Sequence, residues 1–225
     1  MPSLFSYIIP VDDGAAPNPF GGICTLAICK PVIRRTAKPG DWIAGLGSKR
    51  APSGDLSGKI VYAMKVERVV TLRDYDRLVR SNSWPRLPDF ETSDHRDRLG
   101  DCIYDFSSGS EPRLRRSVHD HGNRKTDLSG QNVLISRDFY YFGKKAKKLP
   151  SDLLGIVHQN QGHRKAANHR YFPRFEEWIR KSGWEVGKLY GDPDFEIDWD
   201  NLGGCKGCIR RRKQGESDGQ TRPFC

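Results

Sequence analysis

The pattern of apolar and polar positions predicts a chain built mainly from short strands, with a few helices between them. The strongest strand signal is residues 60–70, which are rich in β-branched and aromatic side chains. Their alternation is imperfect, so we expect a strand buried on both faces at its start and wetted on one face near its end. Helical spacing of apolar residues predicts helices over residues 71–79 and 172–182, the second with Pro173 in its first turn and Gly183 at its end. The other predicted strands cover residues 4–9, 23–29, 42–44, 132–136 and 139–143, and a single bulged strand is an alternative for the last two.

Two long polar stretches organise the rest of the chain. Residues 107–129 hold almost no apolar residues, which predicts a loop that a ligand would order. From residue 187 onward the chain is polar, and its last part is glycine-rich and basic. A length of 225 residues favours one domain with elaborations over two. We therefore predict a domain over residues 1–186 and a C-terminal extension over residues 187–225.

The turn around Trp42 is the stretch that most resembles a binding site. Pro39 and Gly40 predict a tight turn before it. Gly45 and Gly47 follow with no side-chain bulk, so another molecule could approach the backbone closely. The alternative is an ordinary hairpin inside a β-rich core.

The loop over residues 16–22 is the second candidate. It contains two prolines and two glycines, which exclude regular structure. A loop so constrained is typical of binding loops, because its shape costs little further entropy on binding. Phe20 in this loop is either a hydrophobic plug or a platform on which a ligand stacks.

The charge of the chain points to a polyanionic partner. Lysine and arginine number 38 against 28 aspartates and glutamates, which gives a formal net charge of +10. Such an excess favours nucleic acid or nucleotide phosphate as a partner, and solubility alone is the alternative. No apolar run reaches the ~20 residues that would span a bilayer, and the start of the chain does not resemble a signal peptide. We expect a cytoplasmic protein without a membrane partner.

The six cysteines are spaced irregularly, so we expect reduced thiols rather than a disulfide framework. Cys24 and Cys29 fall on opposite faces of a predicted strand and are interpreted as small core residues, and no cysteine has a convincing catalytic context. Cys205 and Cys208 have the spacing of half a zinc site, which Cys225 and a distant histidine would have to complete. Zinc is the one cofactor that the sequence suggests, and this half-site is a weak signal for it.

No familiar catalytic motif is present. The chain lacks the metalloprotease, serine-hydrolase, phosphate-loop and dinucleotide-binding signatures. The pair His119 and His121 has few carboxylates near it and is weak as a metal site. Asp101 and His163 are titratable groups in glycine-punctuated segments, so an enzyme with these two as general acid and base is one hypothesis.

Several short motifs stand out together as a set: Ala16-Pro17-Asn18-Pro19-Phe20, Gly40-Asp41-Trp42-Ile43, Gly47-Ser48-Lys49, Gly100-Asp101-Cys102-Ile103-Tyr104 and Gly162-His163-Arg164. With these motifs the chain resembles the nucleotide modification associated domain family, in its second numbered group. The resemblance spans residues 4–179 and implies a role in nucleotide or DNA-base modification systems of bacteria and phages. Gly40-Asp41 before one strand and Val66-Glu67-Arg68-Val69 at the end of the next give a looser resemblance to PUA-like barrels, which often bind RNA or modified bases.

From the residues and the resemblance together we predict an α+β fold, with a PUA-like bent β-sheet or small β-barrel and flanking helices. The predicted function is binding of a nucleotide or modified nucleic-acid base; the alternatives are an enzyme acting on such a base, or an accessory protein that docks a modification enzyme. Phe20 or Trp42 would stack on the base. Arg113, Arg115 and Arg116, with Lys49, would hold phosphate. The residues predicted to line the pocket are Asn18, Phe20, Trp42, Gly47, Ser48, Lys49, Asp101 and Tyr104.

Overall fold

The computed structural model describes residues 1–82, 84–157, 162–197 and 199, and its largest feature is a seven-stranded mixed sheet. The strands of this sheet are β1 (Leu4–Ile9), β3 (Trp42–Gly47), β4 (Lys59–Lys65), β9 (Phe139–Tyr141), β10 (Lys147–Lys148), β11 (His163–Arg164) and β12 (Lys188–Leu189). The order is β11-β1-β3-β4-β9-β12, and β10 pairs with β4 beside this path. β1 and β3 run parallel, whereas β4 is antiparallel to both β3 and β9. The crossover between the parallel strands β1 and β3 contains the loop over residues 16–22, a short strand and a short helix, and it includes Cys29, which is discussed below.

A second, three-stranded sheet stands beside the first. It consists of β2 (Cys24–Leu26), β8 (Asn132–Ser136) and β5 (Arg68–Thr71), all antiparallel, with β8 in the middle. The expectation of one strand over residues 60–70 is therefore wrong, because this segment forms β4 in one sheet and β5 in the other. Likewise β8 and β9 belong to different sheets, so residues 132–143 form neither a hairpin nor a single bulged strand. Two short strands, β6 (Tyr104–Asp105) and β7 (Arg113–Leu114), pair with each other; β7 lies within residues 107–129, the stretch predicted to be a long loop, and β6 lies just before it.

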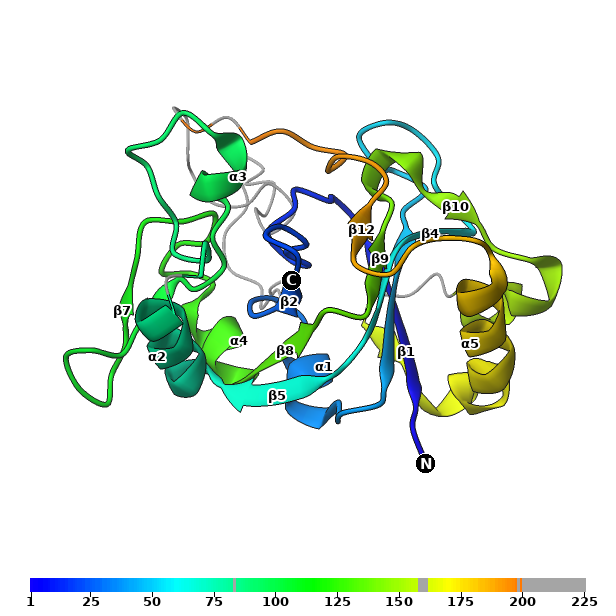
Figure 1. Cartoon of the computed structure of the whole chain (residues 1–225), viewed down its shortest axis with the longest axis horizontal. Helices are drawn as coiled ribbons and strands as arrows, with labels where there is room; N and C mark the ends of the chain where they lie inside the picture. Colours follow the sequence, from blue (N-terminus) through cyan, green and yellow to red (C-terminus); the bar gives the residue numbers. More distant parts are fainter. Residues whose placement is uncertain (83, 158–161, 198, 200–225) are drawn as a thin grey trace, which may run out of the picture.

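Most of the helices lie toward the two ends of the molecule, and α1 (Pro31–Thr36) lies between them (Figure 1). α5 (Phe172–Lys181) lies at one end, where its Phe175 and Ile179 pack into the cluster that contains Trp42. At the other end lie α2 (Leu72–Asn82), α3 (His95–Arg98) and α4 (Arg124–Ser129). Within the described ranges, no helix is both long and apolar enough to cross a membrane. The remaining helical segments are the 3-10 turns η1 (Gly143–Lys145), η2 (Ser151–Ile156) and η3 (Ala166–Tyr171).

The fold is a mixed α and β arrangement, in agreement with the α+β class. In the part of the chain that the structure describes, β11 and β12 stand at opposite ends of the large sheet and do not pair, so the sheet is open. The small closed barrel, one of the two architectures expected from the sequence, is therefore not what this chain forms.

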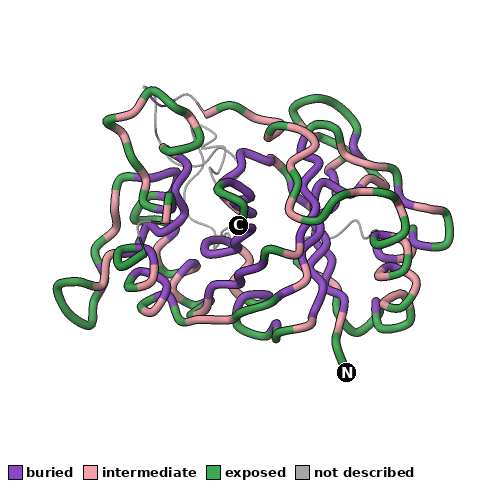
Figure 2. The backbone as a smooth tube through the Cα atoms, in the orientation of Figure 1, coloured by how far each residue is buried: buried purple, intermediate pink, exposed green. Residues whose placement is uncertain are grey.

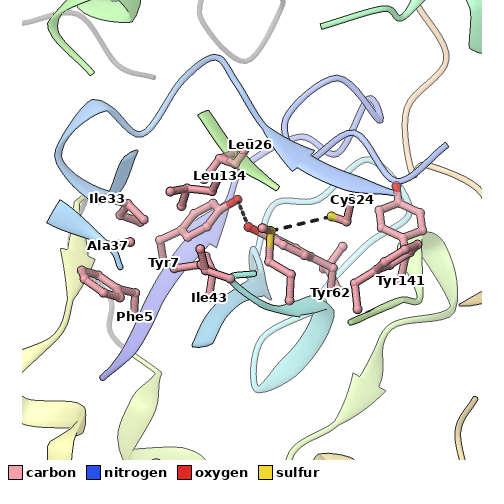
Figure 3. Close-up of a cluster of buried hydrophobic side chains, with 14 of the residues drawn as sticks. Phe5, Tyr7, Cys24, Leu26, Ile33, Ala37, Ile43, Tyr62, Leu134 and Tyr141 are labelled. Carbon is pink, nitrogen blue, oxygen red and sulfur yellow. Dashed lines mark hydrogen bonds between the residues drawn. The ribbon is translucent and has the colours of Figure 1, made fainter. Parts of the chain in front are cut away.

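The core lies between the two sheets. Buried residues concentrate along the strands in the middle of the molecule and exposed residues along the outer loops (Figure 2). The cluster drawn in Figure 3 combines β1, β2, β4, β8 and β9, and within it the hydroxyls of Tyr7 and Tyr62 are 2.9 Å apart. A Cβ on Gly45 would lie 2.3 Å from the Tyr62 ring, so glycine at this position is required by the packing of the chain itself.

Residues 188–197 and 199 pack against the rest of the described chain. β12 pairs in parallel with β9, and Trp199 is buried in a cluster with Phe20 and Val118. The amide N–H of Phe195 donates to the carbonyl oxygen of Asp12 at 2.9 Å. This part of the C-terminal segment therefore contacts the loop that follows β1.

Candidate active site

Cys29 lies in an unusual backbone conformation between β2 and α1. Its φ is +56°, and that of the next residue, Lys30, is +40°. Residues that precede proline are disfavoured in the right-handed helical region, and α1 begins at Pro31. Two successive non-glycine residues with positive φ are nevertheless costly, and such strain persists only where the surroundings fix it.

Two charged side chains hold the backbone of Cys29 in that conformation. The Cys29 N–H donates to Oδ1 of Asp127 at 2.9 Å, and Nε of Arg34 donates to the Cys29 carbonyl oxygen at 2.7 Å. Arg34 is fully buried, and it also donates to the carbonyl oxygens of Asp127 and Asn132. α1 and α4 are thus joined through Arg34, and the strained residue lies at their junction.

The side chain of Cys29 faces a histidine that is itself paired with Asp127. Sγ of Cys29 is 3.5 Å from Nε2 of His119, and Nδ1 of His119 is 2.5 Å from Oδ2 of Asp127. The hydroxyl of Tyr104 donates to the same Oδ2 at 3.0 Å. We call Cys29, His119 and Asp127 the Cys29 triad. Cys29 is 9% exposed, His119 3% and Asp127 0%, so Cys29 is the most exposed residue of the three.

The electrostatics keep Asp127 ionised. Burial alone raises the pKa of this carboxyl, but His119, Arg34 and the N–H of Cys29 outweigh it, and the pKa of Asp127 lies below its ordinary value. Burial raises the pKa of Tyr104 well above that of a free tyrosine, so its hydroxyl keeps the proton that it donates to Asp127. With Nδ1 of His119 facing this buried carboxylate, Nε2 is the ring nitrogen that faces the Cys29 thiol.

This arrangement is the one that nucleophilic catalysis requires. A thiol is activated when an adjacent base accepts its proton and a third group orients that base. Nε2 faces the thiol and Nδ1 faces the carboxylate, so the three residues stand in the order nucleophile, base and orienting acid. Among the residues that the structure describes, no group of three or more histidine, cysteine, aspartate or glutamate side chains is arranged to hold a metal ion.

Two residues of the predicted pocket, Asn18 and Asp101, take part in an internal hydrogen-bond network instead. Oδ2 of Asp101 accepts from Thr25 at 2.5 Å, and Oδ1 accepts from Tyr75 at 2.7 Å. Asn18 donates to the Leu99 carbonyl oxygen at 2.8 Å, and its own oxygen accepts from Arg86. Burial raises the pKa of Asp101. These polar atoms are already occupied, and this network fixes the loop over residues 16–22 against the segment that leads to β6.

Trp42 is enclosed in the core. It has no exposed surface, its ring packs against Tyr140 and Phe175, and its Nε1 donates to Glu176 at 3.1 Å. A ring enclosed in this way has no free face for a base in this conformation. Gly47 is close to Leu56, which a Cβ would meet at 2.4 Å, so the close approach expected there is made by the chain itself.

The remaining predicted residues are dispersed. Ser48 is half-buried and Lys49 is exposed, and both directly follow β3. Phe20 is buried in a cluster with Ile28 and Val118, the neighbours of Cys29 and His119. His163 lies in β11, where it pairs with β1 and its ring is 5.9 Å from that of Phe5. Asp101 contacts Thr25 of β2 and Tyr75 of α2 instead.

The three arginines expected at phosphate differ from one another. Arg115 is bound to Asp76 at 2.7 Å and to Asp105 at 3.4 Å, and Arg113 reaches Asp105 at 3.6 Å. Arg116 lies over the ring of Phe90, with its guanidinium carbon 4.1 Å from the ring centroid. Tyr104 is the predicted pocket residue that contacts the triad directly.

Sequence reasoning missed the triad itself. Cys29 was interpreted as a core residue and His119 only as part of a weak histidine pair, whereas the structure joins both to Asp127. The signal that could have indicated Cys29 is its place just before Lys30-Pro31, at the start of a short helix. The candidate zinc ligands Cys205, Cys208 and Cys225 lie outside the described residues.

The comparisons with known proteins give one match. A family model described as nucleotide modification associated domain 2 matches residues 1–201, which confirms the resemblance and extends it to most of the chain. No curated protein and no solved structure matches the chain.

Proposed function

This chain belongs to the nucleotide modification associated domain 2 family, and on that basis we propose that it is a thiol-dependent enzyme acting on a nucleotide or a modified nucleic-acid base. The observation that carries the proposal is the alignment of Cys29 Sγ, His119 Nε2 and Asp127 Oδ2, at 3.5 Å and 2.5 Å for the successive contacts. The family places the chain in a modification system, and the triad supplies the chemistry.

The reaction class that fits the triad is acyl transfer or hydrolysis of an amide- or ester-like group carried by the nucleotide. His119 takes the thiol proton as the Cys29 sulfur bonds to the carbonyl carbon. The leaving group departs with the proton that His119 returns, and a thioester remains. Water then attacks the thioester, gives a proton to His119, and the C–S bond breaks to restore the thiol.

Asp127 positions the reaction rather than entering it. It fixes the orientation of His119 through Nδ1 and stabilises the imidazolium that forms, as a carboxylate does in related catalytic triads. The same carboxylate binds the Cys29 N–H, so one residue sets both the base and the strained backbone of the nucleophile. This double role is what distinguishes the arrangement from a buried ion pair that only joins two helices.

The more detailed sequence predictions, about the type of sheet and the binding partners, are part of the same proposal. We propose that the large open sheet is a divergent PUA-like sheet, and that the net charge of +10 brings nucleic acid to the enzyme. A modification enzyme remains the proposed protein partner. Binding of nucleic acid through the charged surface would weaken steeply as salt rises, whereas recognition of the modified group at Cys29 would not.

The experiment is a turnover assay with a panel of nucleotides that carry acyl, amide or ester groups, followed by intact-protein mass spectrometry. A productive substrate should add its acyl mass to Cys29 and then be released. The variant Cys29→Ser should abolish turnover, and the matched variant Cys24→Ser, at a buried cysteine outside the triad, should retain it. Turnover that persists in Cys29→Ser would contradict the proposal.

A further inference from the structure

The segment between β7 and the catalytic histidine holds a second group that the triad does not use. Arg116 precedes His119 by three residues, so their Cα atoms lie at most about 11 Å apart. The residue between them that is most buried, Val118, packs in the same cluster as Ile28, the neighbour of Cys29. Arg116 is therefore tied to the triad through a short and well-anchored piece of chain.

The guanidinium of Arg116 makes no ion pair or hydrogen bond with any residue in the described ranges, in contrast to the neighbouring arginines. Arg113 and Arg115 both contact Asp105, and Arg115 also binds the fully buried Asp76. The fork of N–H donors of Arg116 is therefore available to an anion.

An aromatic platform fixes the direction of that fork. The guanidinium carbon of Arg116 is 4.1 Å from the centroid of the Phe90 ring. Phe90 is held in turn by the edge of Trp199, with the ring centroids 5.3 Å apart and an interplanar angle of 83°. Trp199 is itself fixed by a 2.8 Å hydrogen bond from its Nε1 to His95. A stacked guanidinium loses less freedom on binding than one on a mobile side chain.

From these contacts we infer that Arg116, stacked on Phe90, binds the phosphate of the nucleotide on which Cys29 acts. This inference rests on the proposed function and specifies it: the substrate is recognised through its phosphate, not only through its base. A planar, bidentate donor matches the geometry of phosphate oxygens. The phosphate belongs either to a free nucleotide or to a phosphodiester in a strand, and the two have the same recognition chemistry at this residue.

The test is titration calorimetry with nucleoside 5′-monophosphates of the four bases, the corresponding nucleosides, and a short single-stranded DNA. These ligands are titrated into the wild-type chain, Arg116→Ala, Arg116→Lys and the matched control Arg113→Ala. We expect Arg116→Ala to weaken binding of the phosphorylated ligands at least tenfold, and Arg113→Ala to change it less than twofold. Arg116→Lys should fall between the wild-type chain and Arg116→Ala, because lysine keeps the charge but loses the fork and the stacking. The nucleosides should bind all four proteins equally.

Preference for the monophosphates over the strand would identify a free nucleotide as the ligand, and the reverse preference would identify a phosphodiester. Equal weakening by Arg113→Ala and Arg116→Ala, or failure of every phosphorylated ligand to bind the wild-type chain, would overturn the inference. These outcomes do not depend on Cys29 chemistry. Alkylation of Cys29 by iodoacetamide in the same proteins reports separately on the proposed function, because a failure at Arg116 leaves that reaction unchanged.

Discussion

Replacing Asp12 by asparagine should make the protein more stable at pH 8 and leave its stability at pH 4 nearly unchanged. Asp12 is 4% exposed, and its Oδ2 accepts from the hydroxyl of Tyr141 at 2.7 Å, whereas no side chain or backbone group of the described residues lies within hydrogen-bond distance and geometry of its Oδ1. Burial, together with the nearby charges of Asp13 and Asp194, raises the pKa of Asp12 from 3.8 to about 7 despite the hydrogen bond from Tyr141. The ionised form of this carboxyl is therefore disfavoured in the folded protein.

The sign and size of the effect follow from proton linkage. Between pH 4 and pH 7 the folded state binds the Asp12 proton and the unfolded state does not, so the free energy of unfolding falls as pH rises through this window. Because the pKa of Asp12 rises from 3.8 to about 7 on folding, at 1.36 kcal/mol per pKa unit, the free energy of unfolding should fall by about 4 kcal/mol by pH 8. Asparagine is neutral at every pH, and its amide oxygen can still accept from Tyr141. The variant should recover most of that loss.

The assay is urea unfolding of the wild-type chain and of Asp12→Asn at intervals from pH 4 to pH 8.5. The difference between the two free energies of unfolding isolates Asp12 from the other titrating groups. Asp97→Asn, at an exposed carboxyl on α3, is the matched control and should show no such difference. Parallel pH curves for the wild-type chain and Asp12→Asn, or a variant that is less stable at pH 8, would refute the reasoning.

Substitutions at three further positions test the packing around the site and the core. Gly130→Ala should destabilise the chain by about 1–3 kcal/mol in urea unfolding, because the new Cβ would lie 2.3 Å from Nη2 of Arg34; an unchanged stability would show that Arg34 can move away. Tyr104→Phe removes a hydrogen bond to the carboxylate of Asp127 and should cost about 1.5–3 kcal/mol in the same assay, so a neutral result would mean that this bond contributes nothing. Trp42→Ala truncates a buried side chain and should lower the free energy of unfolding by about 3–5 kcal/mol. The milder Trp42→Phe should leave nucleotide affinity in calorimetry unchanged. A loss of affinity without a loss of stability would show that the ring stacks on a base.

The pattern of apolar residues was sufficient to predict those helices and strands whose own sequence shows a clear periodicity. Residues 4–9 form β1 as predicted, and the helix predicted over residues 172–182 is α5, with Gly183 at a φ of +74° just after it. Both elements show a clear apolar pattern and are bounded by residues with strong conformational preferences. The division of residues 60–70 between two sheets was not predictable, because it depends on pairing partners far away in the chain.

The site depended still more on distant contacts. Cys29 and His119 are 90 residues apart, and Cys29 and Asp127 are 98 apart. Only the folding of α4 against α1 brings them together, through the buried Arg34, whose role no local pattern indicates. Tyr104 and Arg116 were chosen from the sequence for their residue types, and the structure places the first against Asp127 and the second over the ring of Phe90. Trp42 and Asp101 had equally suitable residue types, yet packing and hydrogen bonding use both of them internally.

The most direct test of the Cys29 triad is the rate at which iodoacetamide alkylates each cysteine, resolved by peptide mass spectrometry. Burial raises the pKa of the Cys24 and Cys102 thiols well above the ordinary range, so these two residues serve as unreactive internal references. We expect Cys29 to react at least tenfold faster than either reference at pH 7.5, and to lose that advantage in His119→Ala and most of it in Asp127→Asn. A Cys29 that reacts no faster than Cys24 in the folded wild-type chain, or equally fast without His119, would contradict the assignment of a catalytic thiol.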